Sequence, residues 1–146
     1  RWETACEDSS LWQFEPTVIH GLMQLGHLLV ENENVVAVDQ WRDFRVGDPA
    51  RDLAWLTTPA ASDFHMAVVT SYRSARASAD RWVLQRARFY AELAVAKWLL
   101  HGMDSHNETI TEDATAMLSA LHDRVSGDMD QALTQPISQA KHPLEN

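Results

Sequence analysis

The sequence predicts an α+β domain in which helices predominate, and three observations carry this prediction. Residues 17–48 hold short apolar runs separated by turn residues, which is the pattern of short strands. Residues 49–134 carry apolar residues at helical spacing, with helix start and stop signals between the segments. The chain has 146 residues, which fits a single domain over 1–135 followed by a polar tail over 136–146.

Composition narrows the class of function. The chain has 12 Lys and Arg against 21 Asp and Glu, a net charge of −9, which disfavours a nucleic-acid partner because phosphate binding relies on clustered basic residues. No apolar run approaches the ~18 residues of a membrane span. A single cysteine, Cys6, excludes an internal disulfide and a cysteine-rich zinc site. We therefore expect a cytoplasmic domain without a membrane or nucleic-acid partner.

Short β-branched runs predict strands in the first half. Thr17–Ile19 is one such run, and Leu28–Val30 and Val35–Val38 are two more. The polar segment 31–34 between the last two predicts a hairpin. We expect two or three short strands over 17–41, with an ordered loop over 20–27.

The second half predicts helices, expected over about 49–57, from Ser62 onward, over about 78–101, and from Thr111 to Gly127. Asp48 and Pro49 form a helix start, with Asp as the N-cap and Pro at the first helical position. Gly102 is expected to end the longest helix, because glycine commonly follows the last helical turn.

Three segments resemble one enzyme family. Residues 20–30 read H-G-L-M-Q-L-G-H-L-L-V, residues 38–41 read V-D-Q-W, and residues 46–54 read V-G-D-P-A-R-D-L-A. Aminoglycoside and macrolide phosphotransferases have H-G-D-x-H-P-G-N/H, V-I-D-W and V-G-D-P-A-x-D-L-A in the same order and near the same spacing. His27 and the helix around Phe89–Leu93 are more similar to the macrolide branch.

This resemblance implies a two-lobed, protein-kinase-like fold, of which the chain covers the C-terminal lobe. That lobe would comprise a short hairpin that carries the catalytic-type loop, over 17–41, and a helical part over 49–134. The nucleotide-binding N-terminal lobe is expected to be absent, since residues 1–16 are too short for it. The family uses ATP or GTP with Mg²⁺, but we expect no cofactor for this chain.

The residues that carry the family's chemistry are missing. The Asp of H-G-D orients the acceptor hydroxyl and takes its proton, and Leu22 occupies that position here. The Asp of V-I-D-W holds Mg²⁺, and Gln40 occupies that position. Gln24 replaces the second histidine of the loop. Asp39 is one alternative ligand, but neighbouring residues on a strand point to opposite faces, so it should face away from the site.

The remaining loop histidines have plain structural interpretations. His20 could be a relic of catalysis, but a histidine that hydrogen-bonds the loop backbone is the favoured interpretation. His27 falls at a metal position of the family, and with Leu22 and Gln40 as neighbours we expect it not to bind a metal.

Two aspartates are candidates for bracing the loop. We expect Asp48 to cap its helix and also hold the catalytic-type loop. Asp52 lies one helical turn later and either contributes to that bracing or pairs with Arg51 or Arg45 at the surface.

A substrate groove is expected between the loop and the helices, with Trp82, Trp98 and Tyr90 as candidate wall residues. For the two tryptophans, a place in the core is the alternative. The family resemblance and the acidic charge suggest a cationic, antibiotic-like small molecule as ligand. A lone C-terminal lobe would expose an apolar surface, so we also expect a homo-oligomer or a separately supplied N-terminal lobe.

The sequence thus predicts a phosphotransferase-like domain that is catalytically inactive and retains small-molecule or protein binding. The alternative is part of an active ATP- or GTP-dependent antibiotic phosphotransferase whose N-terminal lobe lies outside this chain. A third hypothesis is a purely structural interaction domain.

Overall fold

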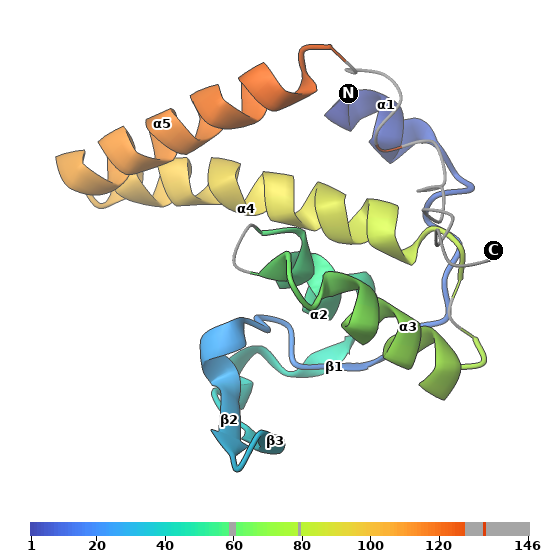
Figure 1. Cartoon of the computed structure of the whole chain (residues 1–146). Coiled ribbons are helices and arrows are strands. Elements are labelled where there is room, and N and C mark those ends of the chain that lie inside the picture. The colour runs from blue at the N-terminus through green and yellow to red at the C-terminus, as the bar shows by residue number, and fades with distance from the viewer. Residues whose placement is uncertain (59–60, 79, 128–132, 134–146) are drawn as a thin grey trace, which may run out of the picture.

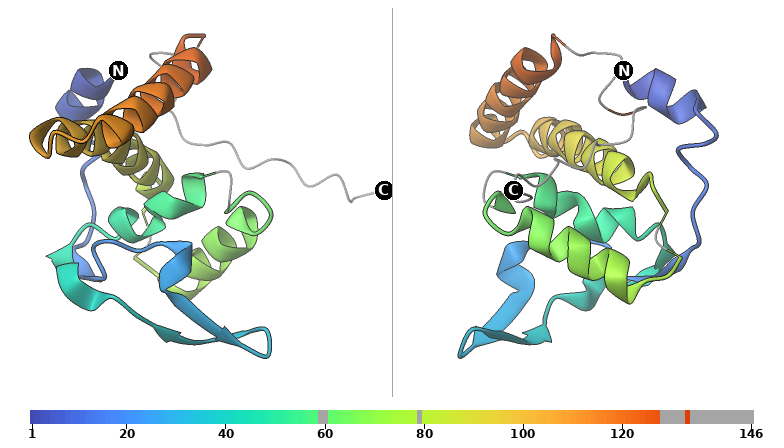
Figure 2. Two further views of the ribbon diagram at one scale, coloured as in Figure 1. Left: turned by 90° about the vertical axis from the view of Figure 1, so that its left-hand side faces the viewer. Right: turned by 45° about the vertical axis from the view of Figure 1, so that its right-hand side comes forward.

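The computed structural model describes residues 1–58, 61–78, 80–127 and 133 (Figure 1). The expected tail over 136–146 lies outside the described residues. Two long antiparallel helices form one layer, shorter helices lie beside it, and the strands lie at the edge farthest from the long helices (Figures 1 and 2). This arrangement confirms the predicted α+β class with predominant helices.

Two small antiparallel sheets make up the strand region. β1 (Thr17–Ile19) pairs with β4 (Arg45–Gly47), and β2 (Leu28–Glu31) pairs with β3 (Asn34–Val38). The hairpin of β2 and β3 was expected, whereas β4 was not. β4 has only three residues, and its register pairs Gly47 with Thr17, which lies 30 positions earlier in the chain. Hydropathy patterning is local and therefore carries no signal for this pairing.

The hairpin turn consists of Asn32 and Glu33, which both have positive φ values, 49° and 63°. Positive φ at both central residues is the geometry of a type I′ turn, which matches the natural twist of paired strands. The hairpin projects from the helical body (Figure 2), and its apolar side chains remain largely exposed, among them Leu29, Val30, Val35 and Val36.

The helices are α1 (Trp2–Glu7), α2 (Ala50–Leu53), α3 (His65–Ala75), α4 (Val83–Asp104) and α5 (Glu108–Val125), with 3₁₀ turns η1 (Leu25–His27), η2 (Trp41–Asp43) and η3 (Ala54–Thr57). α1 is an addition to the expected elements. α3 begins after Ser62, and α4 begins later than expected, because each is preceded by hydrogen-bonded turns. Within the described residues, no helix is long and apolar enough to cross a membrane.

α4 is the centre of the molecule because both hydrophobic clusters pack on it. The first cluster joins the start of α4 to α2, η3 and α3, and its buried members include Leu53, Leu56, Val69 and Leu84. The second joins α4 to the N-terminal segment, and its buried members are Ala5, Leu11, Phe89 and Leu133. The N-terminal segment is therefore part of the fold.

Gly102 does not end the longest helix, contrary to the prediction. It is buried within α4, which continues to Asp104, and a Cβ there would lie 2.8 Å from Oγ1 of Thr111 and 2.9 Å from Cγ2 of Ile110. Glycine is therefore needed at position 102 because α5 approaches α4 closely there. The start of α5 is also earlier than expected, because Asn107 caps it by accepting a hydrogen bond from the Ile110 amide at 3.2 Å.

We expect the Gly102→Ala substitution to destabilise the protein by about 1–3 kcal/mol, the usual cost of overpacking. This is the opposite of the ~1 kcal/mol gain that helix propensity alone would give. Urea unfolding measures the change. Gly26→Ala is the control, because a Cβ at Gly26 meets nothing within 4 Å. Equal or greater stability of Gly102→Ala would show that α5 moves aside without cost.

Candidate functional site

The catalytic-type loop leaves β1 and returns through η1 to β2. Its second residue, Gly21, has φ = 87°, a region that side-chain-bearing residues rarely adopt. A Cβ at Gly21 would also collide with the backbone carbonyl oxygen of Asp43 in η2. The loop therefore requires glycine on both conformational and steric grounds.

Asp52 holds the start of this loop from α2. Its Oδ2 accepts a hydrogen bond from the His20 amide at 2.7 Å, and its Oδ1 accepts one from the Gly21 amide at 2.8 Å. The alternative of surface pairing with Arg51 or Arg45 is wrong for Asp52, because both of its oxygens face the loop backbone. Arg45 instead forms an ion pair with Asp43 at 2.9 Å.

His20 uses both ring nitrogens in structural hydrogen bonds. It is 3% exposed, its Nε2 lies 2.7 Å from the Asp39 carbonyl oxygen, and its Nδ1 lies 3.3 Å from the Leu22 amide. These partners require Nε2 to donate and Nδ1 to accept. Its ring centroid lies 5.2 Å from that of His27 and 4.9 Å from that of Trp41. Neither nitrogen of His20 is available as a ligand or proton carrier.

The three positions at which the family has reactive or metal-binding side chains carry uncharged residues here: Leu22, Gln24 and Gln40. Leu22 is 54% exposed, and Gln24 is exposed beside it. Gln40 has φ = 63°, and its amide donates a 2.6 Å hydrogen bond to Oδ1 of Asp39. The Asp39 carboxylate thus caps the adjacent backbone.

The residues at the family's metal positions do not fit Mg²⁺. That ion prefers several hard oxygen ligands in octahedral geometry. His27 and Gln40 offer an imidazole and a neutral amide, and the Asp39 carboxylate is engaged as described. Across the described ranges, no group of three or more His, Cys, Asp or Glu side chains could hold a metal ion.

Asp48 belongs to a buried charge network rather than to the loop. Arg86 of α4 is 0% exposed and donates to Asp48 through Nε at 2.7 Å and Nη2 at 3.1 Å. Asp48 also accepts from the Ala50 amide at 2.9 Å and the Tyr90 hydroxyl at 3.1 Å. Asp48 thus has the helix-capping role, and its hydrogen bonds within the described residues go to Ala50, Arg86 and Tyr90, whereas Asp52 holds the loop amides.

Arg86 also joins two further segments to this network. Its Nη1 donates to the Leu11 carbonyl oxygen at 2.9 Å and to Oδ1 of Asp80 at 2.8 Å. Arg86 is not among the residues predicted from the sequence, although a signal for it exists. It lies on the apolar side of its helix, between Val83 and Phe89, where an unpaired charge would be too costly to bury.

The network shifts the pKa values of its members. Burial disfavours the charged form of Arg86, but its hydrogen bonds with Asp80 and Asp48 outweigh burial and raise its pKa. Burial likewise raises the pKa of Asp80, but hydrogen bonds and charge from Arg86 produce a net lowering. The ionised carboxylate of Asp80 therefore stabilises the folded protein at any pH above its ordinary pKa. This contribution to the free energy of unfolding is lost as the pH falls through the lowered pKa of the folded state. Burial, with the charge of Asp48, raises the pKa of Tyr90 to about 12.

A groove of about 610 Å³ lies between the loop and the helices. Its walls come from residues 21–26 of the loop, from α2 and η3, from α4, and from Met117 of α5. Tyr90 and Trp98 line it, as predicted for them from the sequence, and Leu22 lines it as well. Trp82 does not line it, because its ring packs against the second hydrophobic cluster with Arg81 4.9 Å above it.

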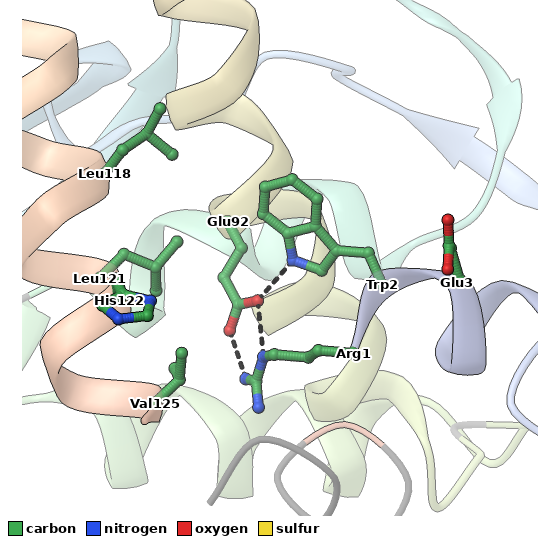
Figure 3. Close-up of a pocket in the computed structure, with 8 residues that line it drawn as sticks. All are labelled: Arg1, Trp2, Glu3, Glu92, Leu118, Leu121, His122 and Val125. Carbon is green, nitrogen blue, oxygen red and sulfur yellow. Dashed lines mark hydrogen bonds and ion pairs between the residues drawn. The ribbon is translucent and has the colours of Figure 1, made fainter. Parts of the chain in front are cut away.

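A second cavity, of about 390 Å³, lies between α1, α4 and α5 (Figure 3). Its buried carboxylate, Glu92, forms an ion pair with Arg1 at 2.5 Å and accepts a 2.8 Å hydrogen bond from Nε1 of Trp2. Apolar side chains of α5, including Leu121 and Val125, form the opposite wall. It shares no residue with the three motifs, so the groove is the candidate functional site.

We expect Asp48→Ala to cost about 3–5 kcal/mol, the range for breaking a buried ion pair. An isolated N-cap loss would cost only about 1–2 kcal/mol. The larger value follows because Arg86 would keep its charge in the core and lose both of its hydrogen bonds to Asp48. Urea unfolding measures the cost, with the exposed Glu112→Ala of α5 as control. A loss near 1 kcal/mol would reduce Asp48 to a helix cap.

We expect Asp52→Asn to accelerate hydrogen exchange at the amides of His20 and Gly21 by about tenfold, the equivalent of one lost hydrogen bond. An asparagine side chain has one acceptor oxygen and cannot serve both amides. Exchange followed by NMR measures this, with the exposed Asp63→Asn as the matched control. Unchanged exchange would assign the bracing to the hydrogen bonds of His20.

Comparisons with known proteins agree with this geometry. The model of the phosphotransferase enzyme family (APH) matches residues 1–90. A macrolide 2'-phosphotransferase type I is 28% identical, with a TM-score of 0.67, over 80% of this chain and 39% of that structure. The macrolide 2'-phosphotransferase MphH from Brachybacterium faecium is 25% identical, with a TM-score of 0.62 and the same coverage.

A gentamicin complex of APH(2")-IIa, at 17% identity, shares the fold with a TM-score of 0.63, over 90% of this chain and 41% of that structure. A search of curated proteins found no match. The chain spans about two-fifths of the length of these solved structures. The matched motifs, the loop geometry and these structures together show that the chain belongs to the phosphotransferase enzyme family and has the kinase-like fold of its C-terminal lobe.

Proposed function

We propose that this chain is a phosphotransferase-family domain that binds a small molecule in its groove and does not itself transfer phosphate. One observation carries the proposal: the loop is fully braced, yet Leu22 occupies its reactive position and faces the groove. A leucine side chain can neither orient an acceptor hydroxyl nor accept its proton.

The metal position supports the same conclusion. Phosphoryl transfer depends on divalent cations that neutralise charge on the phosphates. Gln40 cannot neutralise such a cation, and the carboxylate of its neighbour Asp39 is turned back to the Gln40 amide. Two independent requirements of the reaction therefore fail at the two family positions.

The scaffold of the site, by contrast, is intact. Asp52 holds the loop, Gly21 takes its special conformation, and the groove remains open beside them. A site that keeps its shape but lacks its reactive groups is suited to binding. The related structures are named as a macrolide 2'-phosphotransferase and as a complex with gentamicin, and a small molecule of comparable size is the class proposed here.

We expect no ATP- or GTP-dependent phosphorylation of a macrolide or an aminoglycoside by the 146-residue chain. We also expect no Mg²⁺-dependent nucleotide binding. Loss of general-base assistance alone typically costs about 100–10,000-fold in rate, and loss of charge neutralisation adds to it. Mass spectrometry of the drug and calorimetry with Mg²⁺ and nucleotide are the measurements.

The double variant Leu22→Asp with Gln40→Asp tests what else is missing. We expect it to remain inactive, because no described segment supplies a wall on the other side of the nucleotide. The variant Leu22→Asn with Gln40→Asn is its uncharged control. Micromolar nucleotide binding, or phosphate on a drug incubated with the unaltered chain, would overturn the proposal in favour of an active kinase.

A further inference from the structure

The charged residues that line the groove are of one sign. They are Arg51 of α2 and Lys97 of α4, and no Asp or Glu of the described part of the chain lines the groove. This differs from the chain as a whole, whose net charge is −9. Charges beyond the Debye length of about 8 Å at physiological salt are largely screened, so the nearby groups determine the local potential.

Both cations are available to a ligand. Lys97 is exposed, and among the described residues neither it nor Arg51 forms an ion pair with a carboxylate. The Arg51 guanidinium lies 4.6 Å from the centroid of the Tyr90 ring, which orients it at the groove wall. A guanidinium carries five N–H donors, so Arg51 can contact Tyr90 and still bind the carboxylate of a ligand.

Three carboxylates on the helices that form the groove, or beside them, are already engaged. Asp48 pairs with Arg86 and accepts from Tyr90, and Asp52 accepts the two loop amides. Asp113 of α5 accepts a 3.0 Å hydrogen bond from Nε1 of Trp98. A cationic ligand in the groove would therefore meet two cations of the wall before it met an unengaged carboxylate.

The rest of the wall is apolar. The loop contributes Leu22, Met23 and Leu25, and the helical side contributes Trp55 and Trp98. The volume of about 610 Å³ lies in the range of ligand sites, roughly 300–1,000 Å³. Such walls favour an extended apolar body, because burying apolar surface is the main source of affinity in pockets of this kind.

We propose that the groove binds an apolar carboxylate, with its apolar body against the loop and the tryptophans and its acid group on Arg51 or Lys97. This inference rests on the proposed function, since it requires the groove to be a binding site. It replaces the cationic ligand that the family resemblance implies. Leu22 contributes to the change of sign, because an Asp there would put a negative charge in the wall.

The test uses two probes of equal chain length and opposite charge, decanoate and decylammonium, below their micelle-forming concentrations. Binding to the 146-residue chain is measured by calorimetry and by tryptophan fluorescence, which Trp55 and Trp98 report from within the groove. We expect decanoate to bind about tenfold more tightly, the ratio that one charge-assisted hydrogen bond gives.

Variants locate the acid group. Lys97→Met or Arg51→Met should lower decanoate affinity, and Leu22→Asp should lower it while raising decylammonium affinity. Arg124→Met of α5 is the matched control, because it removes an exposed cation that does not line the groove. Circular dichroism shows that each variant is folded before binding is compared.

The outcomes separate this inference from the proposed function. Tighter binding of decylammonium, or decanoate affinity that neither Lys97→Met nor Arg51→Met changes, overturns the anionic ligand while the groove remains a binding site. Failure of both probes to bind overturns the anionic ligand and the binding role together. Phosphate transfer by a chain that binds decanoate overturns the proposed inactivity alone.

Discussion

The ion pair between Arg86 and Asp48 is the interaction on which the rest of the structure depends. The guanidinium lies in the core and bonds to the V-G-D-P segment, to Asp80 before α4, and to the carbonyl of Leu11 in the N-terminal segment. Burying a charge is tolerated only when hydrogen bonds replace the lost water. Each of these segments is therefore held where it satisfies Arg86, and together they surround α4.

The loop follows from that pair by a short chain of contacts. Asp48 caps the helical segment that starts at Ala50, and Asp52 is one turn further along the same helix. Asp52 then holds the amides of His20 and Gly21. None of these contacts involves Leu22 or Gln40, so the contacts that hold the loop are independent of the side chains at those two positions. The shape of the loop therefore does not depend on which side chains stand at positions 22 and 40.

Several side chains have roles that their spacing along the chain does not reveal. Gly102 looks like a helix terminator, but it lies within α4 and leaves room for α5, because a Cβ there would overlap Ile110 and Thr111. Trp82 was a candidate for the groove wall or the core, and it packs against the second hydrophobic cluster. The sign of the groove's charge is also a tertiary property: Arg51 and Lys97 line one wall while the surrounding acids are bonded elsewhere.

By itself the sequence determined the fold class, the β2–β3 hairpin, the helices of the second half and the family, and it raised the hypothesis that Leu22 and Gln40 stand at reactive positions. These depend on local patterning and on residue identity within short motifs. Only the tertiary structure decided the β1–β4 pairing, the partners of Asp52 and the burial of Arg86. Those bonds join residues 32 and 38 positions apart, and which distant groups meet is set by how the helices pack around α4.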